Sequence, residues 1–150
     1  MRLANSVSVR VFCREEEDRE LIVNRLKLLL PFDLEKEKIK IEERSAEGFE
    51  DRQIKIFSVE LDRERHTNAF VNNLVEKLGD EKKTLLEQLE SRLDDELNFF
   101  IRLDKEMLLK DRFVLTDSGN CYHIRVNIAS FPRSRANAVK VIRALIIGPA

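Results

Sequence analysis

The chain has 150 residues, the size of one ordinary domain, and 37% of them are charged, although the formal net charge is only −1. No apolar run approaches the roughly 20 residues that a membrane-spanning helix requires. The two cysteines, Cys13 and Cys121, form no disulfide framework, which is typical of free thiols in a reducing compartment. We therefore expect a single domain over residues 1–150, in the cytoplasm and without a membrane partner.

The N-terminal part of the chain predicts a strand followed by a helix. From Ser6 to Cys13, apolar and polar residues alternate, which is typical of a half-buried strand. The acidic run from Glu15 to Asp18 suits the positive end of a helix, and Pro31 stops that helix. The apolar residues expected in the core are Val7, Val9, Val11 and Cys13 in the strand and Ile22, Leu26, Leu29 and Leu30 in the helix.

The middle of the chain predicts a hairpin and then two helices. Strands near Ile39–Glu43 and over Gln53–Leu61 flank a turn at Glu47–Asp51, an arrangement that makes an antiparallel pair. The two helices expected next run from His66 or Thr67 to Leu78, with Gly79 as C-cap, and from Asp80 to about Asp94.

The last third of the chain predicts mainly strands and a final helix. The expected elements are a strand over Asn98–Leu103, a helical turn at Glu106–Lys110, a short strand at Phe113–Leu115, a strand over Cys121–Ser130 and a helix capped by Ser134. Hairpins outnumber crossovers in this order of elements. We therefore predict an α+β fold with one mostly antiparallel sheet of about five strands and helices mainly on one face.

The small net charge conceals an uneven distribution of charge along the chain. Residues 1–14 and 118–150 together contain eight Lys and Arg and no acid, a formal charge of +8. The remaining 19 basic and 28 acidic residues lie between them and sum to −9. Such asymmetry indicates an anionic partner.

A composite surface follows if the first and last strands are neighbours in the sheet. Their polar faces would place Arg10, Phe12 and Arg14 beside His123, Arg125 and Asn127. Aromatic rings stack on bases and arginines neutralise phosphates, so this surface suits single-stranded RNA. Arg133, Arg135 and Lys140 would add phosphate contacts. Two other interpretations remain: the acidic middle pairs with these arginines, or Phe12 marks the interface of a homodimer.

Candidate catalytic and metal-ligating residues are few. Cys121 and His123 would supply half of a zinc site, without a second ligand pair at finger spacing. Asp94, Asp95 and Glu96 are consecutive, and carboxylates in a row mostly point apart. We therefore predict no enzyme activity, no cofactor and no metal.

Several segments resemble an archaeal family of small proteins described as RNA-binding and as predicted subunits of the exosome. The resemblance rests on Val7–Cys13 before the acidic helix start, Ala46–Phe49 before Gln53–Ile54, Phe100–Lys105 and Tyr122–Val126. Members of that family are similar in fold to the large-subunit ribosomal protein that binds the small ribosomal RNA. The resemblance implies an antiparallel sheet backed by helices, RNA association and an archaeal cytoplasm. It also adds Arg102 and Lys105 to the candidate RNA-binding residues.

The resulting hypothesis is a non-enzymatic RNA-binding or RNA-processing accessory module, with RNA and RNA-processing proteins as partners. The alternative is a homodimeric protein-interaction domain that keeps such a fold without binding RNA. The candidate RNA-binding residues are Arg10, Phe12, Arg14, Arg102, Lys105, Arg125, Arg133, Arg135 and Lys140.

Overall fold

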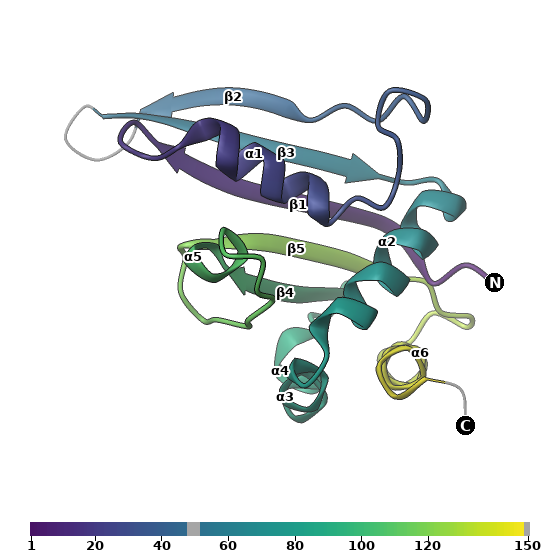
Figure 1. The fold of residues 1–150 in the computed structure, drawn as a ribbon. Helices are drawn as coiled ribbons and strands as arrows, with labels where there is room; N and C mark the ends of the chain where they lie inside the picture. Colours follow the sequence, from purple (N-terminus) through teal and green to yellow (C-terminus); the bar gives the residue numbers. More distant parts are fainter. Residues whose placement is uncertain (48–51, 149–150) are drawn as a thin grey trace.

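The computed structural model describes residues 1–47 and 52–148, and its centre is one antiparallel five-stranded sheet (Figure 1). The strands are β1 (Ala4–Arg14), β2 (Glu42–Glu47), β3 (Gln53–Leu61), β4 (Asn98–Asp104) and β5 (Cys121–Ile128). Their order across the sheet is β2-β3-β1-β5-β4, with every neighbouring pair antiparallel. The first and last strands are therefore adjacent, as the composite surface requires.

Alternation along the strands decides which face of the sheet is buried. In β1 the side chains of Val7, Val9 and Val11 are at most 1% exposed, as the sequence pattern predicts. Tyr122, Ile124 and Val126 of β5 are buried in the same core. Successive side chains of a strand point to opposite faces, so the residues between these must point away from the core.

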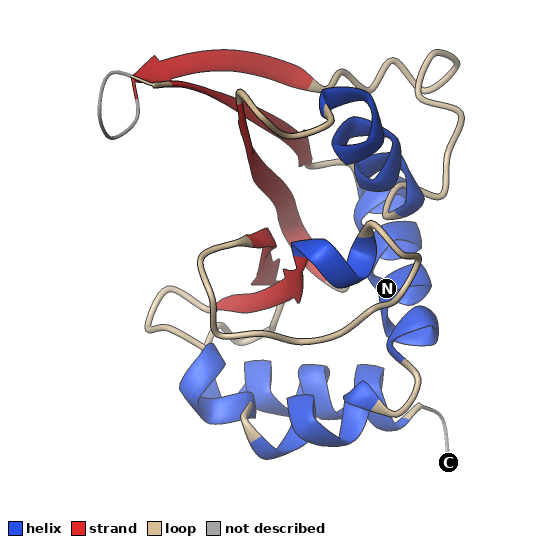
Figure 2. Cartoon of the chain, turned by 60° about the vertical axis from the view of Figure 1, so that its left-hand side comes forward, coloured by secondary structure: helices blue, strands red, loops and turns tan. Residues whose placement is uncertain are grey.

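Helices cover the apolar face of the sheet and leave the other face open, which confirms the predicted fold class (Figure 2). The helices are α1 (Arg19–Leu28), α2 (Glu64–Leu78), α3 (Glu81–Glu87), α4 (Leu89–Arg92), α5 (Lys105–Leu108) and α6 (Arg135–Ile147). None of the described helices is long and apolar enough to cross a membrane.

Side-chain caps begin two of the helices where the sequence indicates. The Asp18 carboxylate accepts a hydrogen bond from the backbone N–H of Leu21 at 3.1 Å, at the start of α1. The Ser134 hydroxyl accepts one from the N–H of Asn137 at 3.1 Å, at the start of α6. Such bonds satisfy N–H groups that have no partner inside a helix. Gly79 ends α2 with a φ of +52°, a conformation that glycine adopts without steric cost.

Three predicted elements differ from the structure. The strand expected near Ile39–Glu43 begins only at Glu42, and most of the turn expected at Glu47–Asp51 lies outside the described residues. The helix expected from Asp80 to about Asp94 is interrupted at Gln88, whose φ of −100° and ψ of 10° leave the helical region. The strand expected at Phe113–Leu115 is reduced to one bridge, between Leu115 and Leu103. Two backbone hydrogen bonds flank it, from Asp104 to Val114 at 2.8 Å and from Thr116 to Arg102 at 3.0 Å.

Candidate nucleic-acid interface

The open face of the sheet, which we define as the outward side chains of β1 to β5, carries a row of basic groups. Arg10 of β1 lies opposite His123 of β5, and His123 lies opposite Arg102 of β4. One step along the strands, Arg125 lies between Ser8 and Phe100. Three adjacent strands therefore bring together cationic and imidazole groups that are distant in the sequence.

Two aromatic rings of the open face accompany the basic groups. Phe12 is 41% exposed, and the guanidinium carbon of Arg10 lies 5.8 Å from the centre of its ring. Phe100 is half-buried, and its ring centre lies 5.6 Å from that of His123, with the two planes inclined by 30°. Exposed rings beside guanidinium groups can stack on bases while the cations reach phosphate oxygens.

His123 is held in an electropositive environment. Its partial burial, together with the charges of Arg10, Arg102 and Arg125, lowers the pKa of the imidazole below its usual 6.5. Burial and neighbouring positive charge both disfavour the imidazolium form. An anion bound beside His123 would reduce that repulsion.

Acidic groups of the open face lie toward the other edge of the sheet. Glu42 of β2 and Glu60 of β3 are exposed there, opposite Ser58 and Ser8 respectively. No carboxylate among the described residues forms an ion pair with Arg10, Arg102 or Arg125. One interpretation of the sequence was that acidic residues of the middle segment pair with these arginines. Within residues 1–47 and 52–148, no such ion pair neutralises Arg10, Arg102 or Arg125.

Arg125 is a half-buried basic group of this face. Its Nε is buried and has no hydrogen-bond partner among the described residues. Burial acts to raise the pKa of Asp94, but hydrogen bonds from Asn98 and Glu96, and to a smaller degree the charge of Arg125, hold that pKa below its usual value. The Nε–H group of Arg125 is therefore a hydrogen-bond donor without a partner among the described residues, on a side chain that lines the open face.

Two hollows adjoin on this side of the molecule. The face hollow, of about 420 Å³, lies over β2, β3, β1 and β5. Arg10, Arg44 and Arg125 line it together with the acidic residues Glu42, Glu43 and Glu60. The edge hollow, of about 520 Å³, lies beside β4 and is lined by Arg92 and Arg102 among others. Phe100 and His123 line both hollows. Phe100 and His123 therefore lie between the two hollows, and a single bound polymer that crosses them could contact both hollows.

A third hollow, of about 520 Å³, lies where the N-terminal segment meets α6. Arg133 and Lys140 line it together with Arg2 and Phe131. Phe131 is 98% exposed, and Arg133 donates a hydrogen bond to the carbonyl of Glu96 at 3.1 Å. Two of the residues expected to contact phosphates therefore share one basic hollow beside the open face.

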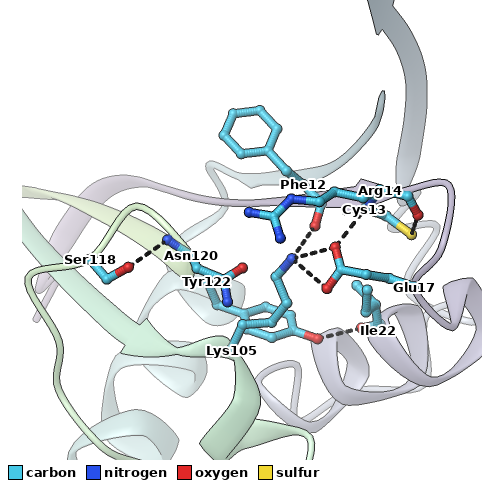
Figure 3. Close-up of polar contacts among 9 residues, drawn as sticks. All are labelled: Phe12, Cys13, Arg14, Glu17, Ile22, Lys105, Ser118, Asn120 and Tyr122. Carbon is cyan, nitrogen blue, oxygen red and sulfur yellow. Dashed lines mark hydrogen bonds and ion pairs between the residues drawn. The ribbon is translucent and has the colours of Figure 1, made fainter. Parts of the chain in front are cut away.

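Lys105 does not lie on the open face, contrary to its expected place among the RNA-contacting residues. Its side chain is 2% exposed, and its Nζ lies 3.0 Å from a carboxylate oxygen of Glu17 and 2.8 Å from the carbonyl oxygen of Phe12 (Figure 3). A buried lysine requires such partners because an unpaired charge in the interior is strongly disfavoured. Lys105 is a structural cation beneath β1.

Two other expected contacts have different positions. Arg135 donates to the carbonyl oxygens of Leu93 at 2.8 Å and Glu90 at 2.7 Å, around the end of α4. Those carbonyls would otherwise lack partners at a helix C-terminus. Arg14 is exposed at the far end of β1, two residues beyond Phe12.

Sequence reasoning did not assign Phe100, Arg44 and Arg92 to the interface. Alternation in β4 predicts that Phe100 points to the open face, because its neighbours Phe99 and Ile101 are apolar and are buried in the core. Arg44 lies in a strand whose start was misplaced, and Arg92 reaches the edge hollow from α4. Only the tertiary structure shows the last of these positions.

The described residues contain no group of three or more His, Cys, Asp or Glu side chains that could hold a metal ion. Cys13 and Cys121 are free and buried, and desolvation raises the pKa of both thiols. The Cys121-x-His123 pair thus has no further ligands in this part of the molecule.

Fold and surface together define a class: a one-sheet α+β protein whose uncovered face is basic and bears aromatic rings. A family model described as RNA binding matches residues 6–129, so the chain belongs to this RNA-binding family.

Archaeal proteins match this chain over almost their whole length. RNA-binding protein PAB1135 of Pyrococcus abyssi is 26% identical over 146 residues, which cover 97% of this chain and 95% of that protein. The uncharacterized protein MJ0213 of Methanocaldococcus jannaschii is 22% identical over 149 residues, covering 97% and 99% of the two chains. The crystal structure of protein AF2318 from Archaeoglobus fulgidus has a TM-score of 0.82 and 26% identity, covering 95% of this chain and 99% of that one.

Proposed function

We propose that the protein binds single-stranded RNA through the basic half of its open face, over β1, β5 and β4. The observation that carries the proposal is the row of Arg10, His123 and Arg102, which faces away from the core without carboxylate partners among the described residues. Each phosphate that such a row neutralises releases counterions, which gives affinity without sequence preference.

The aromatic rings support a single-stranded ligand over a duplex. Phe12 and Phe100 present their rings on a sheet surface, where unpaired bases can stack on them. Bases inside an A-form duplex are already stacked on one another and offer only their edges and phosphates. The acidic groups Glu42 and Glu60 line the β2 and β3 side of the face hollow, so they favour a path over β1, β5 and β4.

Binding to RNA over a salt series tests this proposal. For the unaltered protein, we expect affinity for a labelled single-stranded oligoribonucleotide to fall steeply with salt, with a log–log slope of roughly 0.7 per phosphate contacted. Arg10→Glu and Arg125→Glu should weaken binding and flatten that slope. Lys83→Glu, which makes the same change of charge on the exposed surface of α3, is the control and should leave the slope unchanged. Equal affinity of all four proteins would refute the assignment.

We extend the proposal to a non-enzymatic accessory role in RNA processing, in an archaeal cytoplasm, with proteins of the exosome as partners. Its support is the resemblance of Val7–Cys13, Phe100–Lys105 and Tyr122–Val126 to the family described with that role. The likeness to the large-subunit ribosomal protein that binds the small ribosomal RNA belongs to the same proposal. Co-purification with exosome subunits that survives nuclease treatment would support a protein contact, whereas loss on treatment would leave only a shared RNA.

A homodimer remains the second candidate, because Phe12 and Phe131 are large apolar side chains at the surface, 41% and 98% exposed. Such residues are enriched in the cores of interfaces. Sedimentation velocity at rising protein concentration, together with the RNA-binding assay, distinguishes the homodimeric interaction domain from the RNA-binding module. A dimer that Phe12→Glu dissociates, in a protein without RNA affinity, would support the interaction domain, and a monomer at all concentrations would exclude the dimer.

A further inference from the structure

The edge hollow beside β4 contains one basic group, Arg92, that hydrogen bonds hold in place. Arg92 is half-buried, and its Nε and Nη2 donate to the side-chain oxygen of Gln88 at 2.9 and 2.6 Å. Its Nη1 donates to the carbonyl of Phe100 at 3.3 Å. These three bonds hold the guanidinium in one orientation, and two of its five N–H groups remain for a ligand.

A second guanidinium faces the same space from the sheet. Arg102 donates from Nη1 to the carbonyl oxygen of Asp117 at 3.1 Å, which places the arginine beside the loop that precedes β5. Burial and the charge of Arg102 both lower the pKa of Arg92, which indicates that the two cations repel each other across the hollow. Arginine remains charged in proteins, so an anion between the two would relieve this repulsion.

The edge hollow lies at the β4 end of the open face, where a ligand that crosses the sheet would arrive last. It joins the face hollow through Phe100 and His123, while Gln88 and Ser91 on the helical side and Asp117 on the loop line its outer part. β4 is the last strand of the sheet, and α4 packs against it (Figure 1). A nucleotide chain that crosses β1 and β5 would meet these groups at the edge.

We propose that the edge hollow binds the terminal phosphomonoester of a single-stranded RNA, with Arg92, Arg102 and His123 as the contacts and Phe100 stacked on the end base. This proposal rests on the proposed RNA binding of the open face. A terminal phosphate carries a charge of about −1.5 to −2 at pH 7, whereas an internal phosphodiester carries only −1. Two neighbouring guanidinium groups therefore favour the end of a chain over its interior. A 5′- and a 3′-phosphate share this chemistry.

Asp117 is the one acidic residue that lines the hollow. Its charge raises the pKa of Arg92, which indicates that it offsets part of the positive field. The side chain is exposed, and its backbone carbonyl provides the bond to Arg102. Asp117→Asn therefore removes a repulsive charge from the hollow while leaving the bond to Arg102 in place.

Fluorescence anisotropy tests the proposal with one short oligoribonucleotide in three forms: 5′-phosphate, 3′-phosphate, and hydroxyl groups at both ends. We expect one phosphorylated form to bind about tenfold more tightly than the hydroxyl form, as one or two charge-assisted hydrogen bonds would provide. Arg102→Gln should abolish this preference for the phosphorylated form, and Asp117→Asn should increase the preference. Which form binds more tightly identifies the end of the chain.

The variants also separate this inference from RNA binding itself. Arg44→Gln, on the open face outside the edge hollow, should weaken all three forms by the same factor. If all three forms bind equally well to the unaltered protein, the terminal site is refuted and RNA binding stands. If none of them binds, the function proposed for the open face fails. A phosphate preference that survives in folded Arg102→Gln would also overturn the site.

Discussion

The ammonium group of Lys105 lies 3.0 Å from a carboxylate oxygen of Glu17, and this ion pair joins the start of α5 to the segment that follows β1. The same ammonium donates to the carbonyl of Phe12 at 2.8 Å (Figure 3). The backbone of the most exposed ring on the open face is therefore anchored from the core side. Glu17 also accepts a bond from the N–H of Arg14 at 3.0 Å.

Replacing Lys105 with Met should destabilise the protein by about 3 kcal/mol, because the carboxylate of Glu17 would stay mostly buried without its partner. Chemical denaturation measures the change in the free energy of unfolding. Lys105→Met combined with Glu17→Gln should recover part of the loss, since no unpaired charge remains. A single variant as stable as the unaltered protein would show that the pair does not contribute.

Replacing Phe12 with Ala should weaken RNA binding by about 1–3 kcal/mol, the usual contribution of one stacked base. The salt slope should not change, because no cation is lost. Phe131→Ala, which removes an exposed ring from the N-terminal and α6 hollow, is the comparison that locates the stacking. An unchanged affinity of Phe12→Ala would contradict a role for the ring, and a changed slope would indicate a disturbed Arg10.

Replacing Arg135 with Met should lower stability by about 1 kcal/mol and leave RNA affinity unchanged. The guanidinium bonds carbonyl oxygens at the end of α4, and those oxygens then have only water as partner. Thermal unfolding and anisotropy provide the two readouts. A loss of RNA affinity together with unchanged stability would return Arg135 to the phosphate contacts expected from the sequence.

His123 should make the protein less stable in mild acid. The folded state holds its pKa below 6.5, through partial burial and then through Arg10, Arg102 and Arg125. As the pH falls through about 6.5, the unfolded chain takes up the proton first, so stability decreases until the folded histidine also protonates. Asp117 and Arg92 line the same hollow as His123.

Denaturant unfolding of the unaltered protein and of His123→Gln, at pH values above and below 6.5, measures this effect. The stability difference between the two should shift in favour of His123→Gln on acidification, while the carboxylates titrate equally in both. If the stabilities of the two proteins change in parallel with pH, protonation of His123 is not coupled to unfolding.

The resemblance of several segments pointed to an RNA-binding family, whereas the candidate site could be predicted only in part. Arg10, Phe12 and Arg125 were predicted because alternation assigns each strand residue to a face. Lys105 was predicted from its charge and its segment, and the structure buries it against Glu17 because α5 turns inward after β4. Charge alone does not tell a surface cation from a paired interior one.

The sequence by itself determined most elements: the alternating β1 and β5, the acidic start of α1, the cap residue Ser134 and the glycine that ends α2. These are properties of short segments, set by backbone geometry and the burial of one face. Only the tertiary structure decided that β1 lies against β5, and that Arg92 comes to face Arg102 across the edge hollow. The physical reason is that strand pairing depends on how the whole apolar surface is buried, and no local pattern encodes a partner more than 100 residues away.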